Sequence, residues 1–592
     1  MIFQNLNDEQ IVAVKADGHL LLTACPGSGK TRVITRKVAW ELQNLSHPKR
    51  RIVALTFTIR AAEEIERRMR HMNVDTSQLW TGNIHAFCLN WILRPYACFH
   101  PCTQKGFTIV DSVKADEIMS EIVKKHNLSK NDKYKVRFKF NPDGTVTAPN
   151  QAIKAVLNEY HDSLINNRFV DFECLLYYSF ELLERHPKTA ENLSSIFQTI
   201  LVDEYQDTQE LQYQIIFNIV KAGKGRTDVC FVGDYDQAIY GSLGGVAKTK
   251  EEIEAGIGQE MQQLSLPGNY RTCQRVIDYY RHFQTAPIPI EARGENAGER
   301  GIVTLDTDTS KDNLPEAVAR LITQSLEMGI PEKEICVLVP QWYLVMSLAK
   351  KLRALLPDVS FDATGISPMS GNRDNIFFKL TKLFMTEPSP RIYSLRYRWA
   401  REVSEELIFL TDNEKDAERY APKKLLRTIN GIKSGEENAI DYLTDCFSQF
   451  FDKLELEINL IPPLEINYES YFKGIKRRID DPNYALPGDI QSFRNFYKDA
   501  KGVVVSSCHG VKGEEFETVI SFGLLEGHLP HWGEIFDPDS DEDEVARKLL
   551  YVICSRAKTN LHLIAETGRK RGWEDISLEP TPHLLEIEFD YD

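Results

Sequence analysis

Short apolar runs that end in polar residues recur along the chain, with amphipathic stretches between them. A bounded apolar run of about four to eight residues is typical of a strand buried in a parallel sheet. In the first half of the chain these runs are Leu20–Thr23, Ile52–Thr58, Ile200–Glu204 and Val229–Asp234. In the second half they are Gly301–Leu305, Glu334–Val339, Val503–Ser507, Thr518–Phe522 and Asn560–Ile564. The helical periodicity of the stretches between them, such as Arg32–Leu42, predicts an α/β protein with parallel sheets.

Length and composition narrow the class of protein. A chain of 592 residues is too long for one hydrophobic core, so several domains are expected. The sequence shows no apolar run of membrane-spanning length and no signal-peptide pattern, which predicts a cytoplasmic protein with no membrane partner. The 11 cysteines are scattered, and Cys98 and Cys102 could form only half of a metal site. A net charge of −15 argues against a general nucleic-acid coat but allows a local basic groove.

The segment Ala24–Thr31, "ACPGSGKT", has the composition of a phosphate-binding loop. Glycines let backbone N–H groups surround phosphate oxygens, a lysine neutralises their charge, and a threonine hydroxyl can ligate Mg²⁺. The alternative is an ordinary glycine turn. The strand predicted before the segment and the helix predicted after it favour the phosphate loop, which makes ATP and Mg²⁺ the expected ligands.

Charged residues that follow other predicted elements suit the same chemistry. Asp203 and Glu204 are adjacent acids at the end of a strand, where ligand chemistry collects in open parallel sheets. One can hold Mg²⁺ through water while the other orients or deprotonates the attacking water. Arg271 and Arg556, the latter expected on the helix of "ARKLLYVICSRAKT", could stabilise charge on a transferred phosphoryl group. Taken alone, each arginine is better explained as an ordinary surface residue.

These segments form an ordered set that resembles superfamily 1 helicases of the UvrD/Rep/PcrA type. The resemblance is dense only at the motifs, which extend from residue 6 to about residue 558. In order they are "LNDEQ", "ACPGSGKT", "ALTFTIRAAEEI", "TGNIHAFC", "LVDEYQDT", "FVGDYDQAIYG", "GNYRT", "SSCHGVKGEEFE" and "LLYVICSRAK". Any one of these strings is weak, whereas the set in the correct order is a specific signal.

The resemblance implies a nucleotide site shared between two cores. Gln10 would read adenine through its amide, and Tyr270 would stack on the base. The phosphate loop would contribute Ala24, Gly27, Ser28, Gly29, Lys30, Thr31 and Arg32, with Thr31 and Asp203 toward the metal. Glu204 would act on the attacking water, while the remaining residues would approach the nucleotide and its γ-phosphate: Gln237, Arg271, Glu515 and Arg556.

The resemblance also implies a track for single-stranded DNA. Its residues would be Phe57, Thr58, His85, Tyr240, His509 and Lys512, with the last two facing either DNA or the interface between cores. The departures from the family pattern fall on this side. Ser242-Leu243-Gly244 stands where Trp-Arg-Gly is usual, Ile59 where Asn is usual, and Asn83-Ile84 where Thr-Phe is common. Since base stacking contributes roughly 1–3 kcal/mol per base, ATP hydrolysis is the firmer inference and processive unwinding the weaker one.

The resemblance gives an expected domain plan of two RecA-like P-loop NTPase domains, each with a mainly helical insertion. The first core would comprise residues 1–95 and 190–271, with its insertion at 96–189. The second core would comprise residues 272–365 and 500–592, with its insertion at 366–499. Within the first insertion, alternation over 134–140, a Pro-Asp-Gly turn and a short return predict a β-hairpin. Its basic face, Lys135, Arg137 and Lys139, could follow phosphates or could simply be solvated.

The leading functional prediction is a DNA-dependent ATPase and helicase that moves 3′ to 5′ on single strands and unwinds duplex DNA. The first alternative is a nucleotide-gated regulatory ATPase that controls a partner nuclease and unwinds little by itself. Short UvrD-like proteins of phage-defence systems, such as the Gabija type paired with an OLD-like nuclease, look similar in this respect. The second alternative, a catalytically inactive scaffold, conflicts with the presence of Lys30, Asp203, Glu204, Arg271 and Arg556.

Overall fold

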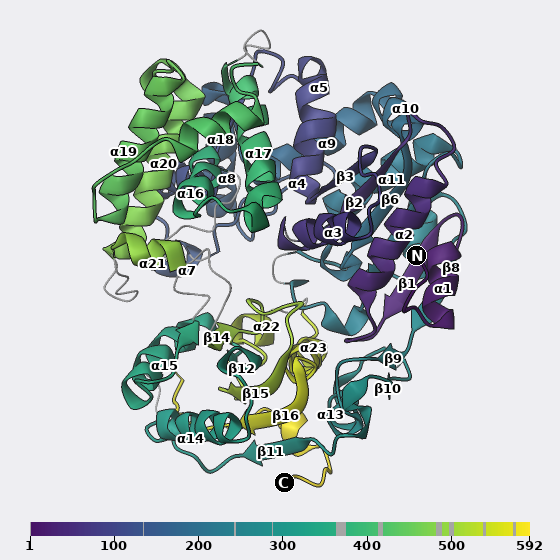
Figure 1. Ribbon diagram of the computed structural model, residues 1–592, viewed down its shortest axis with the longest axis vertical. Helices are drawn as coiled ribbons and strands as arrows, with labels where there is room; N and C mark the ends of the chain where they lie inside the picture. Colours follow the sequence, from purple (N-terminus) through teal and green to yellow (C-terminus); the bar gives the residue numbers. More distant parts are fainter. Residues whose placement is uncertain are drawn as a thin grey trace. The chain divides into compact units, whose positions relative to one another are not determined.

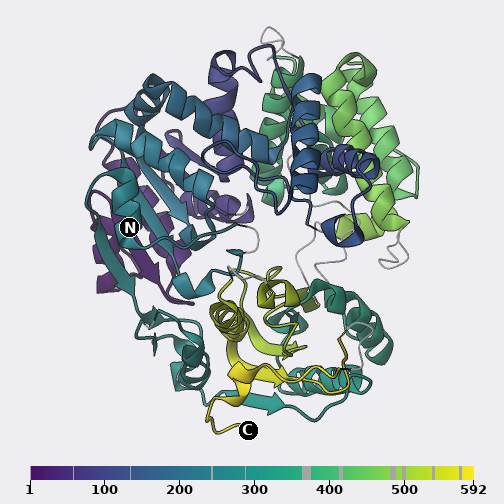
Figure 2. The ribbon, with the colours of Figure 1, turned by 180° about the vertical axis from the view of Figure 1, so that it is seen from behind.

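The computed structural model describes residues 2–57, 59–133, 135–241, 244–286, 288–362, 375–411, 418–480, 488–495, 502–536, 540–571 and 576–592. The chain divides into two compact units (Figures 1 and 2). The core unit consists of Met1–Tyr96, Tyr178–Gly365 and Ala500–Asp592. The insertion unit consists of Ala97–Tyr177 and Ile366–Asp499. Each unit is therefore assembled from chain segments that are far apart in sequence.

The core unit contains two six-stranded parallel sheets, as expected for two RecA-like cores. The first sheet has the order β3-β2-β6-β7-β1-β8. Its strands are β1 (Leu20–Ala24), β2 (Arg51–Leu55), β3 (Leu79–Gly82), β6 (Phe197–Asp203), β7 (Asp228–Gly233) and β8 (Gln262–Leu266). Its principal helices are α1 (Asp8–Lys15), α2 (Lys30–Gln43), α3 (Ile59–His71), α10 (Pro187–Ile196), α11 (Glu210–Gly223) and α12 (Lys250–Ile257). The two edge strands β3 and β8 were not predicted, whereas the inner four were.

The second sheet has the order β11-β16-β15-β12-β14-β13. Its strands are β11 (Ile302–Asp306), β12 (Ile335–Val339), β13 (Phe361–Asp362), β14 (Val503–Ser507), β15 (Phe516–Phe522) and β16 (Ala557–Ile564). Its helices include α13 (Gln274–Tyr280), α14 (Leu314–Glu327), α15 (Trp342–Leu355), α22 (Trp532–Ile535), α23 (Glu542–Cys554) and α24 (Pro582–Leu585). All strands except the two-residue β13 were predicted, and the central strands β12 and β14 are nearly continuous apolar runs.

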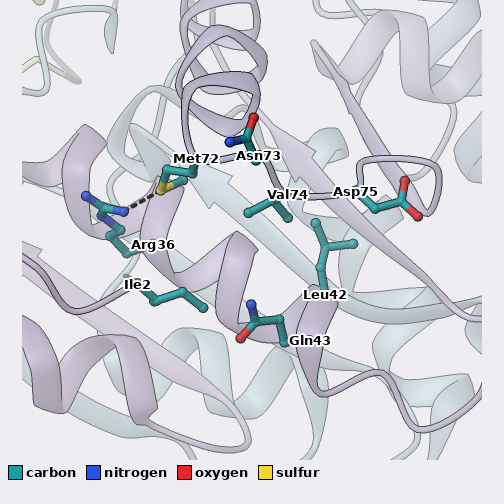
Figure 3. Close-up of a pocket in the computed structure, with 8 residues that line it drawn as sticks. All are labelled: Ile2, Arg36, Leu42, Gln43, Met72, Asn73, Val74 and Asp75. Carbon is teal, nitrogen blue, oxygen red and sulfur yellow. Dashed lines mark hydrogen bonds between the residues drawn. The ribbon is translucent and has the colours of Figure 1, made fainter.

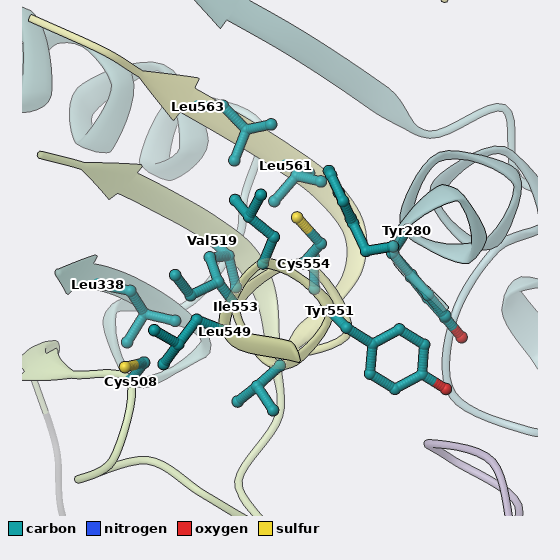
Figure 4. Packing of buried hydrophobic residues seen from close by; sticks show 14 of the residues in the cluster. Tyr280, Leu338, Cys508, Val519, Leu549, Tyr551, Ile553, Cys554, Leu561 and Leu563 are labelled. Atoms are coloured by element: carbon teal, nitrogen blue, oxygen red, sulfur yellow. The ribbon is translucent and has the colours of Figure 1, made fainter. Parts of the chain in front are cut away.

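Helix α23 shows how the second core is held together. Its apolar face, including Leu549 and Ile553, packs against Leu338, Val519 and Leu561 of the sheet (Figure 4). The helix ends at Cys554, so Arg556 lies in the turn before β16 rather than on the helix. The sequence-based placement of Arg556 on this helix was therefore wrong. The Ser555 N–H still donates to the Tyr551 carbonyl four residues earlier, whereas the Arg556 N–H donates to the Ile553 carbonyl only three residues earlier, so the regular helical pattern ends here.

The insertion unit is mainly helical. Its first segment supplies α6 (Ser112–Lys125), α7 (Lys130–Lys133), α8 (Gln151–Asn167) and the start of α9 (Phe172–Arg185). Its second segment supplies α16 (Ile376–Met385), α17 (Tyr393–Thr411), α18 (Pro422–Asn430), α19 (Ala439–Lys453), α20 (Pro462–Ile479) and α21 (Ile490–Asn495). The buried Asp111, which caps α6, accepts hydrogen bonds from Asn375 and Ser470 of the second segment. Helix α20 also packs beside α6, so the two insertions form one body.

The predicted hairpin is only partly present. The turn exists: Gly144 adopts φ = 82°, and Asn141 and Thr145 are linked by backbone and side-chain bonds. The only pairing among its described residues is an isolated antiparallel bridge between Phe140 and Val146, so two regular strands do not form. The alternation instead places Phe138 and Phe140 against the rings of α8 and α9.

No helix in the described ranges is both long enough and apolar enough to span a bilayer. Among the described residues, no group of three or more His, Cys, Asp or Glu side chains could hold a metal ion by itself. Cys98 is exposed and Cys102 is half-buried, and both are free thiols.

The four-part domain boundaries given above remain a prediction.

Candidate nucleotide site between two cores

The phosphate loop lies between β1 and α2 and is shaped by two glycines with positive φ. Gly27 has φ = 71° and Gly29 has φ = 82°, a region that other L-residues rarely adopt. A Cβ atom on Gly27 would lie 2.5 Å from Oδ1 of Asn269 and 2.7 Å from Cβ of Arg271. The Gly27 carbonyl also accepts a hydrogen bond from the Tyr270 N–H over 2.9 Å. The loop backbone therefore passes directly against the segment that carries Tyr270 and Arg271.

Lys30 begins α2 and carries a buried ammonium group. Within the described part of the chain, its Nζ has no hydrogen-bond partner, and it lies 3.5 Å from Oε2 of Glu204. The Ser28 hydroxyl is likewise buried without a described partner. The first N–H groups of a helix also lack partners within the helix, and Gly29 offers no side-chain cap to α2. Unpaired donors around a glycine loop fit a phosphate group.

The surroundings of the two acids at the end of β6 shift their pKa values in opposite directions. Glu204 follows Asp203 in the left-handed conformation, with φ = 53°. Burial opposes the charge of Glu204, but Lys30 and Lys512 prevail and hold the pKa of its carboxyl well below its usual range. Burial and the neighbouring Glu204 charge raise the pKa of Asp203. A bound divalent cation would counter that rise, and Asp203 and the Thr31 hydroxyl are oxygen ligands of the type Mg²⁺ prefers.

A chain of hydrogen bonds runs from these acids into the second core. Gln206 Nε2 donates to Glu204 Oε2 over 2.6 Å, and Gln206 Oε1 accepts from the Asp234 N–H over 3.1 Å. Gln237 Nε2 donates to Asp234 Oδ2 over 2.7 Å. Arg556 Nη2 then donates to Gln237 Oε1 over 2.9 Å. The chain links the segments after β6 and β7 of the first core to the turn before β16 of the second.

The two predicted arginines lie close enough to repel each other. Arg271 pairs with Glu515 over 2.6 Å and donates to the Ser555 carbonyl over 3.0 Å. Arg556 is 1% exposed and makes no ion pair among the described residues, since its hydrogen-bond partners are carbonyl, amide and hydroxyl oxygens. Burial and the charge of Arg271 lower the pKa of Arg556 to about 10. An anion such as a phosphoryl group would relieve this unfavourable arrangement.

The two residues predicted to bind adenine, Gln10 and Tyr270, already form hydrogen bonds with other groups of the protein. The Gln10 amide accepts from the Asn7 N–H and donates to the Ser28 carbonyl over 2.9 Å, and Gln10 is 2% exposed. Asn7 in turn donates to the Tyr270 hydroxyl over 2.6 Å, while the Tyr270 ring remains partly exposed. Gln10 would therefore have to exchange these partners to read a base, whereas Tyr270 could stack on one as it stands.

Several residues predicted to contact single-stranded DNA lie close to Asp203 and Glu204. Phe57 is 42% exposed, and its ring centroid lies 4.8 Å from that of Tyr240. The Tyr240 hydroxyl donates to the His509 carbonyl over 3.2 Å. Phe57, Asn83, Ile84 and His85 line a cavity of about 70 Å³ together with Asp203 and Glu204. Thr58, Ser242 and Leu243 lie outside the described residues, as does the side chain of Ile59.

Lys512 lies at the contact between cores, one of the two places expected for it. Its ammonium donates to Asp207 Oδ2 over 2.6 Å and to the Gln237 carbonyl over 2.7 Å. These protein partners occupy the side chain, so a contact to DNA phosphate stays a prediction that the geometry does not favour.

Sequence reasoning missed four residues that organise the site: Gln206, Asp207, Asp234 and Asn269. All of them stand inside the motif strings. Asn269 Oδ1 accepts from the N–H groups of Arg271 and Thr272, and its amide donates to the Tyr280 hydroxyl over 2.9 Å. A polar residue next to a predicted ligand was the available signal, because such residues commonly orient the ligand.

A second cavity of the first core, of about 330 Å³, contains none of the predicted site residues (Figure 3). It is lined by the N-terminal Ile2, by Arg36 and Leu42 of α2 and by Met72 and Val74 after α3. It is larger than the cavity beside Asp203 and Glu204, which shows that size alone does not locate the chemistry.

The fold and the phosphate loop define a P-loop protein with two RecA-like cores, whose residues meet at the predicted nucleotide site. The model of the UvrD/REP helicase N-terminal domain matches residues 6–255, and that of the UvrD-like helicase C-terminal domain matches residues 490–568. The chain belongs to the UvrD/REP family of superfamily 1 helicases, whose members are ATP-dependent DNA helicases.

Curated relatives match along nearly the whole chain. An ATP-dependent DNA helicase PcrA of Staphylococcus epidermidis is 24% identical over 657 aligned residues, which cover 99% of this chain and 87% of the relative. An ATP-dependent DNA helicase PcrA of Staphylococcus aureus is 25% identical over 651 residues, which cover 99% and 86%. At this identity the family is shared, while individual residue roles rest on the geometry.

Proposed function

We propose that this protein hydrolyses ATP to move 3′ to 5′ along single-stranded DNA and to separate duplex strands. The observation that carries the proposal is the buried ammonium of Lys30, which lacks a hydrogen-bond partner among the described residues. It lies 3.5 Å from Glu204, in a site that a hydrogen-bond chain connects to Arg556 of the other core. The polarity of movement rests on the resemblance of the motifs.

The phosphate end of the site would work through Lys30, Thr31 and the two acids. Lys30 would leave Glu204 and donate to the β- and γ-phosphate oxygens, which carry more negative charge. Thr31 and Asp203 would hold Mg²⁺, which supplies charge neutralisation of the phosphates when it is bound. Once Lys30 is engaged by phosphate, the pKa of Glu204 would rise toward its ordinary value. Its carboxylate could then orient the attacking water and accept its proton.

The second core would supply the groups that hold the γ-phosphoryl group of bound ATP. Gln237 and Arg556 are joined across the two cores, and Arg271 lies beside Arg556. A γ-phosphoryl group would be held by residues of both cores, so its release removes contacts that keep the cores together. Two of the residues predicted to contact DNA lie in the same core: Tyr240 follows the segment of Gln237, and Phe57 follows β2 of the same sheet. Alternating contact between cores would therefore shift the grip on the strand.

The test is the steady-state ATPase rate without nucleic acid, with single-stranded DNA and with duplex DNA. Stimulation by single strands and 3′ to 5′ displacement of a labelled strand are expected. Lys30→Ala and Glu204→Gln should each abolish turnover, and wild-type rates in either would overturn the site assignment. A wild-type rate that ignores nucleic acid would instead favour the regulatory ATPase that acts on a partner nuclease.

A further inference from the structure

Lys512 belongs to the second core, yet its ammonium contacts only the first core within the described part of the chain. It lies in the loop after β14, and its side chain is 8% exposed. Its Nζ donates to Asp207 Oδ2 over 2.6 Å and to the Gln237 carbonyl over 2.7 Å. It also lies 5.0 Å from the centroid of the Tyr240 ring. One cation from one core thus contacts three residues of the other, which lie on the segment after β6 and the segment after β7.

The three partners have different places in the proposed cycle. Asp207 ends the short turn Tyr205–Asp207 that directly follows Glu204. Gln237 holds Arg556 through its side chain while its carbonyl accepts from Lys512. Tyr240 packs on Phe57 and faces His509, with 5.3 Å between the ring centroids. The ammonium therefore touches the hydrolysis segment, the γ-phosphate segment and the predicted base-stacking ring at once.

The charge environment fixes this arrangement. Asp207 is buried, its Oδ1 has no partner among the described residues, and Lys512 is its ion-pair partner. Lys30 and Glu204 are the other charged groups that act on Asp207. A buried pair with one partner removed leaves an uncompensated charge, so Lys512 cannot leave Asp207 at little cost. This makes the side chain a poor phosphate contact and a good mechanical link.

We propose that Lys512 is a positioning residue that couples strand occupancy at Tyr240 to the placement of Gln237 in the nucleotide site. The proposal rests on the proposed function, because it explains how a strand would stimulate hydrolysis. A base that stacks on Tyr240 displaces the ring against the ammonium. The ammonium holds the Gln237 carbonyl, so the displacement reaches the side chain that binds Arg556. The loop bearing Lys512 moves with the second core and transmits the same displacement to that core.

The chain offers a matched control. Lys548 of α23 is also a buried lysine of the second core, and it lies 3.9 Å from the ring centroid of the first-core Tyr235. Its ammonium pairs with Glu544 of its own helix and makes no described bond to Gln237. Lys512→Met should lower the ratio of DNA-stimulated to unstimulated ATPase rate by roughly tenfold, the effect of losing one charge-assisted bond. Lys548→Met should leave that ratio unchanged.

The affinity for single-stranded DNA distinguishes a positioning role of Lys512 from a direct contact between Lys512 and a DNA phosphate. A positioning role predicts that Lys512→Met keeps the single-strand affinity and its dependence on salt. A phosphate contact predicts weaker binding and a salt slope lower by about one. The second result, or an unchanged stimulation ratio, overturns the proposal. A wild-type protein that single strands do not stimulate would defeat the proposed function itself and the coupling with it.

Folding controls keep the result interpretable. Lys512→Arg keeps a cation and should restore part of the stimulation ratio, which a loss of packing alone would not explain. The double variant Asp207→Asn with Lys512→Met leaves no unpaired charge, so its thermal unfolding midpoint should recover relative to Lys512→Met. If the stimulation ratio recovers together with that midpoint, Lys512 acts only through stability and the coupling role is excluded.

Discussion

Arg556 Nη2 donates to Gln237 Oε1 over 2.9 Å, and this bond joins the two cores of the protein directly at the nucleotide site. Both side chains are buried, and Gln237 is held from the other side by Asp234. Among the described residues, the Arg556 guanidinium has hydrogen-bond partners but no ion-pair partner. Separation of the cores would break its bond to Gln237, so the groups predicted to contact the γ-phosphate also take part in the contact between cores.

Arg556→Lys should reduce kcat for ATP by roughly a thousandfold or more, because a lysine cannot reproduce the fork of donors that a transferring phosphoryl group uses. The KM for ATP should change much less. Steady-state ATPase kinetics in saturating single-stranded DNA measure both. Arg275→Lys is the matched control, since Arg275 is also a second-core arginine but pairs with Asp592 over 3.1 Å. A near-normal kcat in folded Arg556→Lys would show that this arginine does not reach the phosphate.

Gly27→Ala should lower the free energy of unfolding by more than the positive φ of Gly27 alone explains. Gly27 and Gly18 both have positive φ, 71° and 78°, but a Cβ on Gly18 meets no atom within 4 Å. Gly18→Ala should therefore lose only about 1–2 kcal/mol of unfolding free energy. Gly27→Ala should lose more, and it should also weaken the binding of a fluorescent ATP analogue, because the added carbon pushes against Asn269. Equal losses in the two variants would contradict the contact between the loop and the Asn269 segment.

The buried His562 should make the core unit less stable in acid. Burial lowers its pKa to about 4, and its Nδ1 lies 2.9 Å from the Thr304 hydroxyl. Between its ordinary pKa near 6.5 and about 4, the unfolded chain binds the proton and the folded chain does not, so stability falls as the pH falls. The loss from this group approaches about 3 kcal/mol. His562→Gln should flatten the curve of unfolding free energy against pH from 7 to 4.

The control for that experiment is His71→Gln at the end of α3, where the side chain is exposed. Its pH curve should follow that of the wild-type protein. A His562→Gln curve as steep as the wild-type curve would mean that other groups cause the acid sensitivity.

The basic segment of the first insertion gives a test of strand binding in the insertion unit. Lys135→Glu, Arg137→Glu and Lys139→Glu together should weaken single-strand binding and reduce the salt slope by about three if these side chains follow phosphates. Charge reversal at Lys423, Lys424 and Arg427 of α18 provides the same change of net charge on the same unit. Equal effects from both triple variants would indicate a general electrostatic effect rather than a track.

The buried strands could be predicted from the sequence, because a strand buried on both faces consists mostly of apolar residues. Most inner strands contain such a run, namely β1, β2, β6, β7, β12, β14 and β15. The inner strand β16, "AKTNLHLI", is interrupted by polar residues. The edge strand β8, "QQLSL", is mostly polar and pairs only with β1, so its side chains carry no such signal. Pairing with a neighbour, rather than composition, makes it a strand.

The segment around Phe138 shows a different limit. Its alternation identified a buried and an exposed face correctly, since Phe138 and Phe140 pack inward. It could not show that the inward face is satisfied by helices α8 and α9 instead of a partner strand. Alternation of apolar and polar residues predicts which face of a segment is buried, but it does not predict which element packs against that face.

Four of the predicted site residues, Lys30, Glu204, Gln237 and Arg556, are linked by a chain of contacts, while their roles stay predictions. The contacts of individual side chains could not be predicted. Lys512 shows why: a lysine in a motif suits a DNA phosphate and a carboxylate equally well. Only the distance to Asp207 separates these two uses, and that distance depends on how segments far apart in the chain meet.

The strand order of the second sheet also determines when the protein can complete its folding during synthesis. Strands β11, β12 and β13 are translated before the second insertion, but β14, β15 and β16 emerge after it. In the finished sheet, β16 and β15 lie between β11 and β12, and β14 separates β12 from β13. No two of the early strands are neighbours. The nascent chain must therefore carry three strands without their final neighbours through the translation of more than a hundred further residues, and unpaired strand edges favour aggregation during this interval.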